Sequence, residues 1–235
     1  MDNINKISIV IPVFNEEKTV TKILAKVFAV DFGKVKLEVI VVNDGSTDNT
    51  LKVLNELKRK YPIKLITYSK NIGKSSALRI GFKHVTGDIV TVQDGDLEYN
   101  PADFVKMLNK MKENDVSVVY GSRRLNKANV QYSGLSFYAG GLFLTYMANI
   151  LYGGSITDEP TCYKMFDTKL LNGLDLKSKR FEFCPEITAK VLKQGINIYE
   201  VPIHYHPRHA SDGKKIKLHD FFEAVWTLFK YRFVN

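Results

Sequence analysis

Residues 90–98 read Val90-Thr91-Val92-Gln93-Asp94-Gly95-Asp96-Leu97-Glu98. The stretch begins with the β-branched, apolar composition of a buried strand and ends with carboxylates on both sides of a glycine. Carboxylates this close repel each other unless a cation neutralises them, and Mg²⁺ or Mn²⁺ prefers oxygen ligands and often bridges to substrate phosphates. We therefore predict a metal–diphosphate site at the end of this strand, with Asp94, Asp96 and Glu98 as the metal ligands.

The backbone conformation of residues 94–98 decides which carboxylates share a face. In an extended segment, Asp94, Asp96 and Glu98 would all point to one side, because side chains alternate along a strand. A tight turn at Gly95 would break this pattern, and Asp-Gly is a common turn dipeptide. The simpler interpretation is therefore a polar turn between a strand and a helix.

The pattern around this stretch indicates an α/β fold with a mostly parallel central sheet and flanking helices. Apolar, β-branched runs alternate with segments of helical spacing. The expected strands are 6–13, 37–42, 63–67, 89–93, 117–120 and 163–166, with an extended segment at 196–203. The expected helices are 19–30, one that opens at 47–50, 77–83, 101–111, 137–152, 186–193 and 218–233.

Polar clusters follow three of the expected strands, at Asn15-Glu16, Asn43-Asp44 and Asp94–Asp96. In parallel α/β sheets, ligands bind outside the carboxyl ends of the strands. We therefore expect these clusters to converge on one edge of the sheet. The sequence contains neither the GxGxxG pattern of dinucleotide sites nor the GxxxxGK[ST] pattern of a P-loop.

Composition limits the possible partners. The 235 residues carry a formal charge of +9, which favours an anionic partner such as nucleic acid, a phosphate-bearing substrate or an acidic membrane surface. The acidic strand ends and the lack of a base-stacking motif argue against nucleic acid. Cys162 and Cys184 form no disulfide framework, and we expect both to be reduced and structural. We find no signal peptide and no run long enough to span a bilayer.

Two segments could meet a membrane surface. Residues 137–152 are apolar, aromatic and almost uncharged, as in a core helix or in a helix that lies among lipid headgroups. Residues 218–233 have an amphipathic pattern, with Leu218, Phe221, Phe222, Val225, Leu228 and Phe229 on one side and Trp226 among them. Because lysines and arginines surround this second segment, we expect a peripheral membrane role.

Several motifs together resemble the nucleotide-sugar half of family 2 glycosyltransferases, which have the GT-A fold. These motifs are Ile11–Glu17, Val42–Asp48, Asn71–Lys74 and Asp94–Asp96. Gly121–Arg123 and the basic loop at 207–215 narrow the resemblance to enzymes like dolichyl-phosphate mannose synthase. Those enzymes transfer a sugar from a nucleotide diphosphate to a polyprenyl phosphate.

The resemblance implies roles for individual residues. The donor nucleotide sugar would meet Pro12, Phe14, Glu16, Asp44, Lys74, Asp94 and Gly95. The metal, Mg²⁺ or Mn²⁺, would be held at Asp94, Asp96 and Glu98. The acceptor phosphate would meet Arg123, Arg208 and Lys214. Asp94, Asp96 and Arg123 would thus be the catalytic residues.

The chain departs from the family pattern at three places. Asn43 stands where many relatives have Asp, and Glu98 stands where relatives of this type often have Gln. Residues 158–164 replace a more glycine-rich segment on the acceptor side. The acceptor and the transferred sugar therefore stay open, with the donor of the GDP-mannose or UDP-glucose type.

The acceptor determines which residues the chemistry needs. A sugar hydroxyl requires a general base, whereas a phosphate monoester is mostly dianionic at neutral pH and requires only cations to position it. No candidate base stands out. His204, His206 and His209 could act as a base or bind a metal, but such histidines are more often structural or solvated. Direct attack by the phosphate would invert the anomeric centre.

These observations lead to one main hypothesis. We expect a single GT-A catalytic domain over 1–235, divided into a nucleotide-sugar half (1–122), an acceptor half (123–217) and an amphipathic helix (218–235). It would be an inverting enzyme that makes a polyprenyl-phosphate sugar at the cytoplasmic face of the membrane. A membrane protein is a possible partner. The alternatives are a glycosyltransferase that acts on a saccharide hydroxyl in surface polysaccharide synthesis and a non-catalytic nucleotide-sugar-binding protein.

Overall fold

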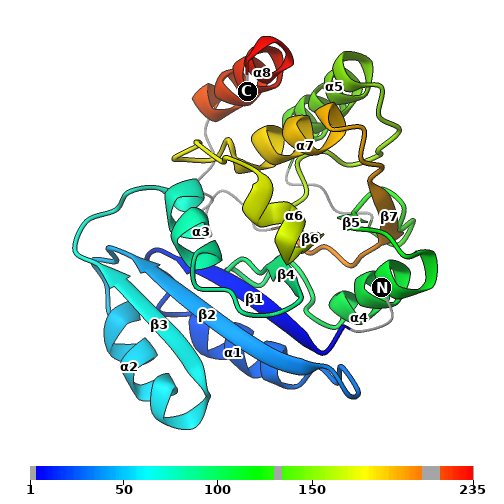
Figure 1. The fold of residues 1–235 in the computed structure, drawn as a ribbon. Helices are drawn as coiled ribbons and strands as arrows, with labels where there is room; N and C mark the ends of the chain where they lie inside the picture. Colours follow the sequence, from blue (N-terminus) through cyan, green and yellow to red (C-terminus); the bar gives the residue numbers. More distant parts are fainter. Residues whose placement is uncertain (1–3, 130–133, 208–217, 235) are drawn as a thin grey trace.

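One sheet organises the molecule (Figure 1). The computed structural model describes residues 4–129, 134–207 and 218–234. Within these ranges the strand order is β3-β2-β1-β4-β6-β5-β7. The strands are β1 (Lys6–Val13), β2 (Lys36–Asp44), β3 (Ile63–Tyr68), β4 (Ile89–Val92), β5 (Val118–Ser122), β6 (Lys164–Asp167) and β7 (Tyr199–Pro202).

The sheet is mostly parallel, which confirms the predicted fold class. Strands β3, β2, β1 and β4 run in one direction, and β5 and β7 are parallel to each other. Strand β6 lies between β4 and β5 and is antiparallel to both. This reversal means that the chain enters β6 at the edge of the sheet where the parallel strands end.

Helices cover both faces of the sheet, and two of them form an outer layer. Helices α1 (Val20–Phe28), α2 (Thr50–Lys60) and α4 (Asp103–Asn114) pack on one face. Helices α3 (Lys74–Phe82), α6 (Thr168–Gly173) and α7 (Phe183–Lys193) pack on the other. Helices α5 (Leu135–Tyr152) and α8 (Leu218–Phe233) lie against α7, far from the β1–β3 end of the sheet (Figure 1).

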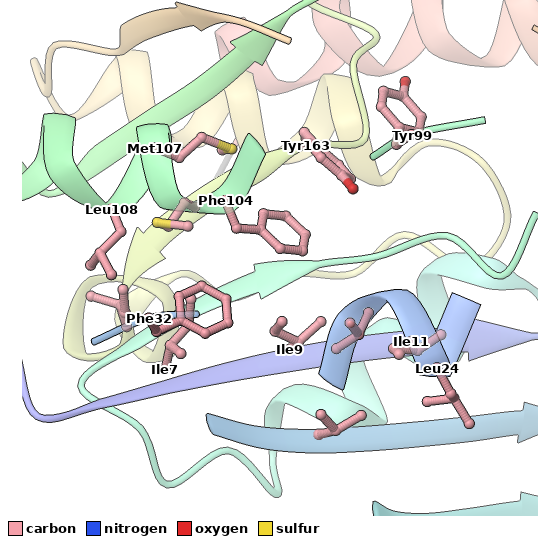
Figure 2. Packing of buried hydrophobic residues seen from close by; sticks show 14 of the residues in the cluster. Ile7, Ile9, Ile11, Leu24, Phe32, Tyr99, Phe104, Met107, Leu108 and Tyr163 are labelled. Atoms are coloured by element: carbon pink, nitrogen blue, oxygen red, sulfur yellow. The ribbon is translucent and has the colours of Figure 1, made fainter. Parts of the chain in front are cut away.

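The core on the α1–α4 face explains why the apolar runs form strands. Ile7, Ile9 and Ile11 alternate along β1 toward this face and are fully buried, while Phe104 and Met107 of α4 close over the same core (Figure 2). Burying a side chain of this size contributes roughly 1.5–3 kcal/mol. Helices therefore cover both faces of β1, which explains why its apolar residues form a nearly continuous run, as in other central parallel strands.

The structure adjusts several predicted boundaries. Helix α3 begins at Lys74 rather than at residue 77, and the short helix α6 was not predicted. Helix α5 buries only one face, formed by Gly141, Leu144, Thr145 and Ala148. In α8 the buried residues are Asp220, Ala224, Thr227, Leu228 and Tyr231, whereas Phe222, Trp226 and Phe229 of the predicted apolar face are exposed.

No helix in the described parts of the chain combines the length and the apolar character that crossing a bilayer requires.

Candidate active site

The acidic strand ends meet in one cavity of about 1310 Å³. Glu16 after β1, Asp44 at the end of β2, and Asp94 and Asp96 after β4 all line this cavity. The predicted convergence of the three polar clusters is therefore confirmed. Because β1, β2 and β4 are parallel neighbours, their carboxyl ends lie at the same edge, as the position of ligands in such sheets requires.

The chain turns directly after β4. Leu97 has a φ of 68°, in the left-handed region, and the Glu98 backbone N–H donates to Asp96 Oδ1 over 3.1 Å. Of the two conformations considered for residues 94–98, the structure therefore has the turn. Gly95 fits closely there, because a Cβ atom on it would lie 3.1 Å from Val13 Cγ1.

After the turn, Glu98 contacts the segment at Tyr205 and His206. Glu98 Oε2 accepts a hydrogen bond from the Tyr205 hydroxyl over 3.2 Å, and the Glu98 carbonyl accepts one from the His206 backbone over 2.8 Å. Among the described residues, no three His, Cys, Asp or Glu side chains form a group that could hold a metal ion. The predicted three-carboxylate ligand set is thus not gathered in this conformation.

Lys74 brings the α3 helix to the acidic strand end. Its ammonium group lies 2.6 Å from Asp94 Oδ1 and donates to Cys162 Sγ over 3.2 Å. Burial alone would lower the pKa of Lys74, but the Asp94 carboxylate and the neighbouring thiols raise this pKa well above its ordinary value. Lys74 therefore stays charged and holds a positive charge at the end of β4.

Asp44 organises the loop that leads into α3. Its two carboxylate oxygens accept hydrogen bonds from the backbone N–H groups of Ile72 and Gly73 over 2.8 and 2.9 Å. Gly73 has a φ of 95°, which favours glycine, and places Lys74 at the start of the helix. Asp44 therefore holds in place the loop that leads from β3 to α3.

The segment after β1 forms another wall of the cavity. Pro12 and Phe14 line it, together with Glu16, whose Oε2 accepts a hydrogen bond from the Thr19 hydroxyl over 2.6 Å. The predicted donor residues Pro12, Phe14, Glu16, Asp44, Lys74, Asp94 and Gly95 all line the same cavity. Their roles toward a nucleotide remain predictions.

Arg123 lines the cavity but is already paired. Its Nε and Nη2 groups donate to the two carboxylate oxygens of buried Asp158, both over 2.7 Å, and its guanidinium lies 5.0 Å from the Tyr205 ring centre. Burial would raise the pKa of Asp158, but Arg123 outweighs this effect and lowers the pKa. Arg123 is thus held in a fixed position by Asp158, a contact that the sequence pattern did not reveal.

Two other arginines lie at the cavity. Arg124 lies 5.4 Å from the Tyr138 ring centre of α5, and Arg180 lies 3.7 Å from Asp220 of α8. Neither was predicted as a site residue; the only signal in the sequence was their position in short basic clusters. Arg208, Lys214 and His209, which were considered, lie outside the described residues. His204 Nδ1 lies 3.0 Å from Asp103 Oδ1 and takes part in a surface contact of α4.

Helices α5 and α8 give the cavity an apolar end. Phe137, Phe143 and Leu144 of α5 and Phe221 and Ala224 of α8 line it. The rings of Phe143 and Phe221 lie 5.9 Å apart across the two helices. One continuous cavity therefore joins the acidic strand ends to an apolar region.

Glu159 is a buried carboxyl group on the cavity wall. Neither of its carboxylate oxygens has a hydrogen-bond partner by distance and angle within the described residues, although Lys164 donates to its backbone carbonyl over 2.8 Å. Burial raises the pKa of Glu159, and the nearby Lys164 ammonium opposes this only in part. Glu159 and its neighbours precede β6, so the reversed strand delivers them to the cavity.

The donor set fits a hard divalent ion. Asp94 and Asp96 offer carboxylate oxygens at the cavity wall, and Mg²⁺ is commonly held by one or two carboxylates together with substrate phosphates. A full set of protein ligands is therefore not required. A metal ion at these two residues would stabilise negative charge on a leaving diphosphate.

Comparisons with known proteins agree with this geometry. The family model for glycosyl transferase family 2 matches residues 8–174. A dolichol-phosphate mannosyltransferase of Pyrococcus furiosus is 28% identical over 229 residues, which cover 96% of this chain and 63% of that protein. The chain thus spans less than two thirds of that relative's length.

Two further similarities point the same way. A dolichyl-phosphate beta-glucosyltransferase of Trichomonas vaginalis is 28% identical over 240 residues, which cover 95% of this chain and 72% of that protein. Glucosyl-3-phosphoglycerate synthase from Mycobacterium tuberculosis, solved with Mn²⁺, UDP and phosphoglyceric acid, has a TM-score of 0.72 at 18% identity and covers 98% of this chain and 80% of its own. The chain has the GT-A fold and belongs to glycosyl transferase family 2.

Proposed function

We propose that this protein transfers a hexose from a nucleotide diphosphate sugar to a polyprenyl phosphate, with inversion at the anomeric carbon. The observation that supports it is the cavity itself, which joins the acidic ends of β1, β2 and β4 to an apolar end between α5 and α8. The donor has a charged diphosphate, and the acceptor has a charged head and an apolar tail. Together they require a cavity with both a polar and an apolar part. Relatives named for mannosyl and glucosyl transfer to dolichyl phosphate support the same reaction class.

The donor occupies the strand-end part of the cavity in this proposal. Pro12, Phe14 and Glu16 flank the nucleoside, Asp44 contacts the base or ribose, and Lys74 reaches the diphosphate. Asp94 and Asp96 would hold Mg²⁺ or Mn²⁺, which would supply positive charge against the departing nucleotide diphosphate. The fixed charge of Lys74 adds to this stabilisation, because it already lies 2.6 Å from Asp94.

The acceptor phosphate occupies the arginine-bearing part of the cavity. Arg124 is better placed than Arg123 to bind it, because the Arg123 guanidinium already gives two N–H groups to Asp158. Arginine forks match phosphate geometry, and Tyr138 holds the Arg124 guanidinium from one side. Arg123 then acts as a neighbouring positive charge, and the roles of Arg208 and Lys214 toward the acceptor remain predictions.

We also propose that the enzyme works at a membrane surface, at its cytoplasmic face. Helix α5 exposes Leu135, Phe137, Leu142, Phe143, Tyr146 and Ile150, and α8 exposes Leu218, Phe222, Trp226, Phe229 and Phe233. An exposed apolar area of this kind commonly marks an interaction site. Since the same helices line the apolar end of the cavity, a lipid acceptor could enter from the bilayer without crossing water.

One observation favours a second candidate, transfer to a saccharide hydroxyl. A hydroxyl acceptor needs a general base, and Glu159 is a cavity-wall carboxyl whose raised pKa suits that task. This alternative and the lipid reaction predict different products. A sugar on a lipid phosphate is released by mild acid, whereas an ordinary glycoside is stable.

A donor panel tests the proposal. The protein is incubated with GDP- and UDP-linked hexoses labelled in the sugar, a short polyprenyl phosphate and Mn²⁺ or Mg²⁺, with and without EDTA. We expect an acid-labile product in the organic phase with one donor, and its loss with EDTA. A product only with soluble saccharides would favour the hydroxyl acceptor, and donor binding by calorimetry without any product would favour a non-catalytic binding protein.

A further inference from the structure

Two thiols lie together at the donor end of the cavity, and the reaction proposed above does not use them. Cys162 lies two residues before the start of β6, and Cys184 lies in the first turn of α7. Both cysteines are free, partly exposed and line the cavity. They come from separate elements, so the fold, and not the local sequence, places them side by side.

The contacts of the two thiols tie them to the donor site. Cys184 Sγ donates over 3.4 Å to the carbonyl of Thr161, the residue that precedes Cys162, so the two thiols lie near each other. Cys162 Sγ accepts a hydrogen bond from Lys74 Nζ over 3.2 Å. The same Lys74 ammonium lies 2.6 Å from Asp94 Oδ1. The thiol pair is therefore one contact away from a carboxylate at the strand end.

The two thiols differ in reactivity. The neighbouring Cys162 thiol lowers the pKa of Cys184, and Lys164 and Lys74 add to this effect against the opposing effect of burial. The pKa of Cys162 is raised by the neighbouring Cys184 thiol, by burial and by Asp94. Since the thiolate is the reactive form of cysteine, Cys184 is the nucleophile of the pair.

We propose that Cys162 and Cys184 form a reversible dithiol site that a small-molecule disulfide oxidises to an intramolecular disulfide, and that this oxidation weakens binding of the nucleotide sugar. The second half of the proposal rests on the function proposed above. Intracellular disulfides that do form are usually transient and redox-sensing, which is consistent with two thiols that are reduced at rest.

The exchange proceeds in two balanced steps. The Cys184 thiolate attacks one sulfur of the oxidant and breaks its S–S bond, which leaves a mixed disulfide on Cys184 and releases one small thiolate. The Cys162 thiolate, after losing its proton to solvent, then attacks the Cys184 sulfur and releases the second small thiol. Two protein thiols are oxidised, and one small disulfide is reduced to two thiols.

Disulfide formation changes the surroundings of Lys74. The two sulfurs must approach to about 2.05 Å to form the bond. In the disulfide neither sulfur can carry a negative charge, and their lone pairs point in other directions than in the free thiols. Lys74 loses the sulfur partner that it has in the reduced protein. Because Lys74 is proposed to reach the donor diphosphate, its displacement lowers donor affinity.

Oxidised glutathione tests the site in the intact protein. We expect intact-mass analysis to show loss of two hydrogens from the wild type and recovery with dithiothreitol. Cys162→Ser should stop at a stable mixed disulfide on Cys184, and Cys184→Ser should react more slowly. If the wild type keeps two free thiols, or carries only mixed disulfides, the dithiol site is wrong.

Titration with UDP and GDP then tests the coupling to the donor. We expect the affinity of the oxidised wild type to fall by about tenfold and to return on reduction, a typical size for coupling between two sites. The Cys162→Ser/Cys184→Ser variant should show no dependence on oxidant. Unchanged affinity in a fully oxidised protein would overturn the coupling. If the reduced protein binds neither nucleotide, the proposed function fails, whereas the mass analysis still judges the dithiol site.

Discussion

At the scale of single residues, three charged side chains on or beside the cavity wall are each held by a specific partner. Asp44 binds two backbone N–H groups of the loop before α3, Lys74 pairs with Asp94, and Arg123 pairs with Asp158. Asp96 Oδ1 accepts a hydrogen bond from the Glu98 backbone N–H in its own turn over 3.1 Å. Substitutions at these positions therefore have different expected effects.

Asp96→Ala should reduce turnover by roughly 100-fold or more while the protein stays folded, because it removes a carboxylate that would hold the metal ion. EDTA should abolish wild-type turnover, and Mn²⁺ or Mg²⁺ should restore it. Initial rates at saturating donor, with circular dichroism as a fold control, measure the effect. A near-normal rate in Asp96→Ala would remove this residue from the metal site.

Arg123→Ala should destabilise the protein by about 3 kcal/mol, because it leaves the buried Asp158 carboxylate without its cation. Urea unfolding measures the change in the free energy of unfolding. Adding Asp158→Asn should recover part of the loss, since the asparagine carries no charge. A destabilisation below about 1 kcal/mol, as is usual for exposed ion pairs, would contradict this role.

Arg124→Ala supplies the matched comparison for acceptor binding. We expect it to raise the KM for polyprenyl phosphate by about tenfold, with little change for the donor, because Arg124 lines the cavity and is proposed to bind the acceptor phosphate. Steady-state kinetics with each substrate varied in turn separates the two effects. An equal rise in both KM values would count against the assignment.

At the scale of elements, the ends of β1 and β2 far from the cavity are joined by one carboxylate. Glu38 of β2 accepts hydrogen bonds from Ser8 of β1, from the backbone and hydroxyl of Thr86, and from the Lys6 ammonium. Partial burial raises the pKa of Glu38, but these bonds outweigh it and lower the pKa from 4.5 to about 2. The ionised form is therefore stabilised by folding.

Glu38→Gln should cost about 1–2 kcal/mol of stability at neutral pH, a value reduced for the partial exposure of the group. Because the folded pKa is depressed, the contribution of Glu38 is present above 4.5 and is lost as the pH falls toward about 2. Urea unfolding of both proteins across this range measures it. A difference that stays constant with pH would indicate a packing effect instead.

In the proposed function, the outer helices α5 and α8 form the surface that contacts a bilayer. Their exposed aromatic side chains include Phe222 and Trp226, with exposed fractions of 61% and 62%. Aromatic side chains on an amphipathic helix bind the interface by burying apolar area, and nearby basic residues add attraction to anionic lipids. The same helices also bury a face against α7, so they need no membrane to be held in place.

Phe222→Ser/Trp226→Ser should weaken binding to vesicles that contain anionic lipid by about tenfold or more, because two exposed aromatic groups no longer enter the interface. Vesicle sedimentation measures the bound fraction. Lys52→Ser/Glu56→Ser on α2, at the opposite end of the molecule, is the control, because it removes two exposed side chains and leaves the net charge unchanged. Equal binding by the aromatic variant and the wild type would exclude this surface from membrane contact.

At the scale of the whole molecule, the sequence predicted what local patterns encode. The apolar runs of β1, β2 and β4 and the acids that follow them are contiguous in the chain, so both the sheet and the acidic edge of the cavity could be predicted. The Arg123–Asp158 pair could not, because its partners are 35 positions apart and only the fold brings them together. The pairing of α5 with α8 was hidden for the same reason.

The direction of β6 was also beyond the sequence, since a strand of four residues carries no sign of its polarity. This reversed strand fills the sheet between β4 and β5, whose inner edges would otherwise be open. A fragment of residues 1–122 would therefore present an unprotected apolar edge and should self-associate, which light scattering would reveal. A separate nucleotide-sugar domain built from residues 1–122 alone would therefore need another element to protect the open edges of β4 and β5.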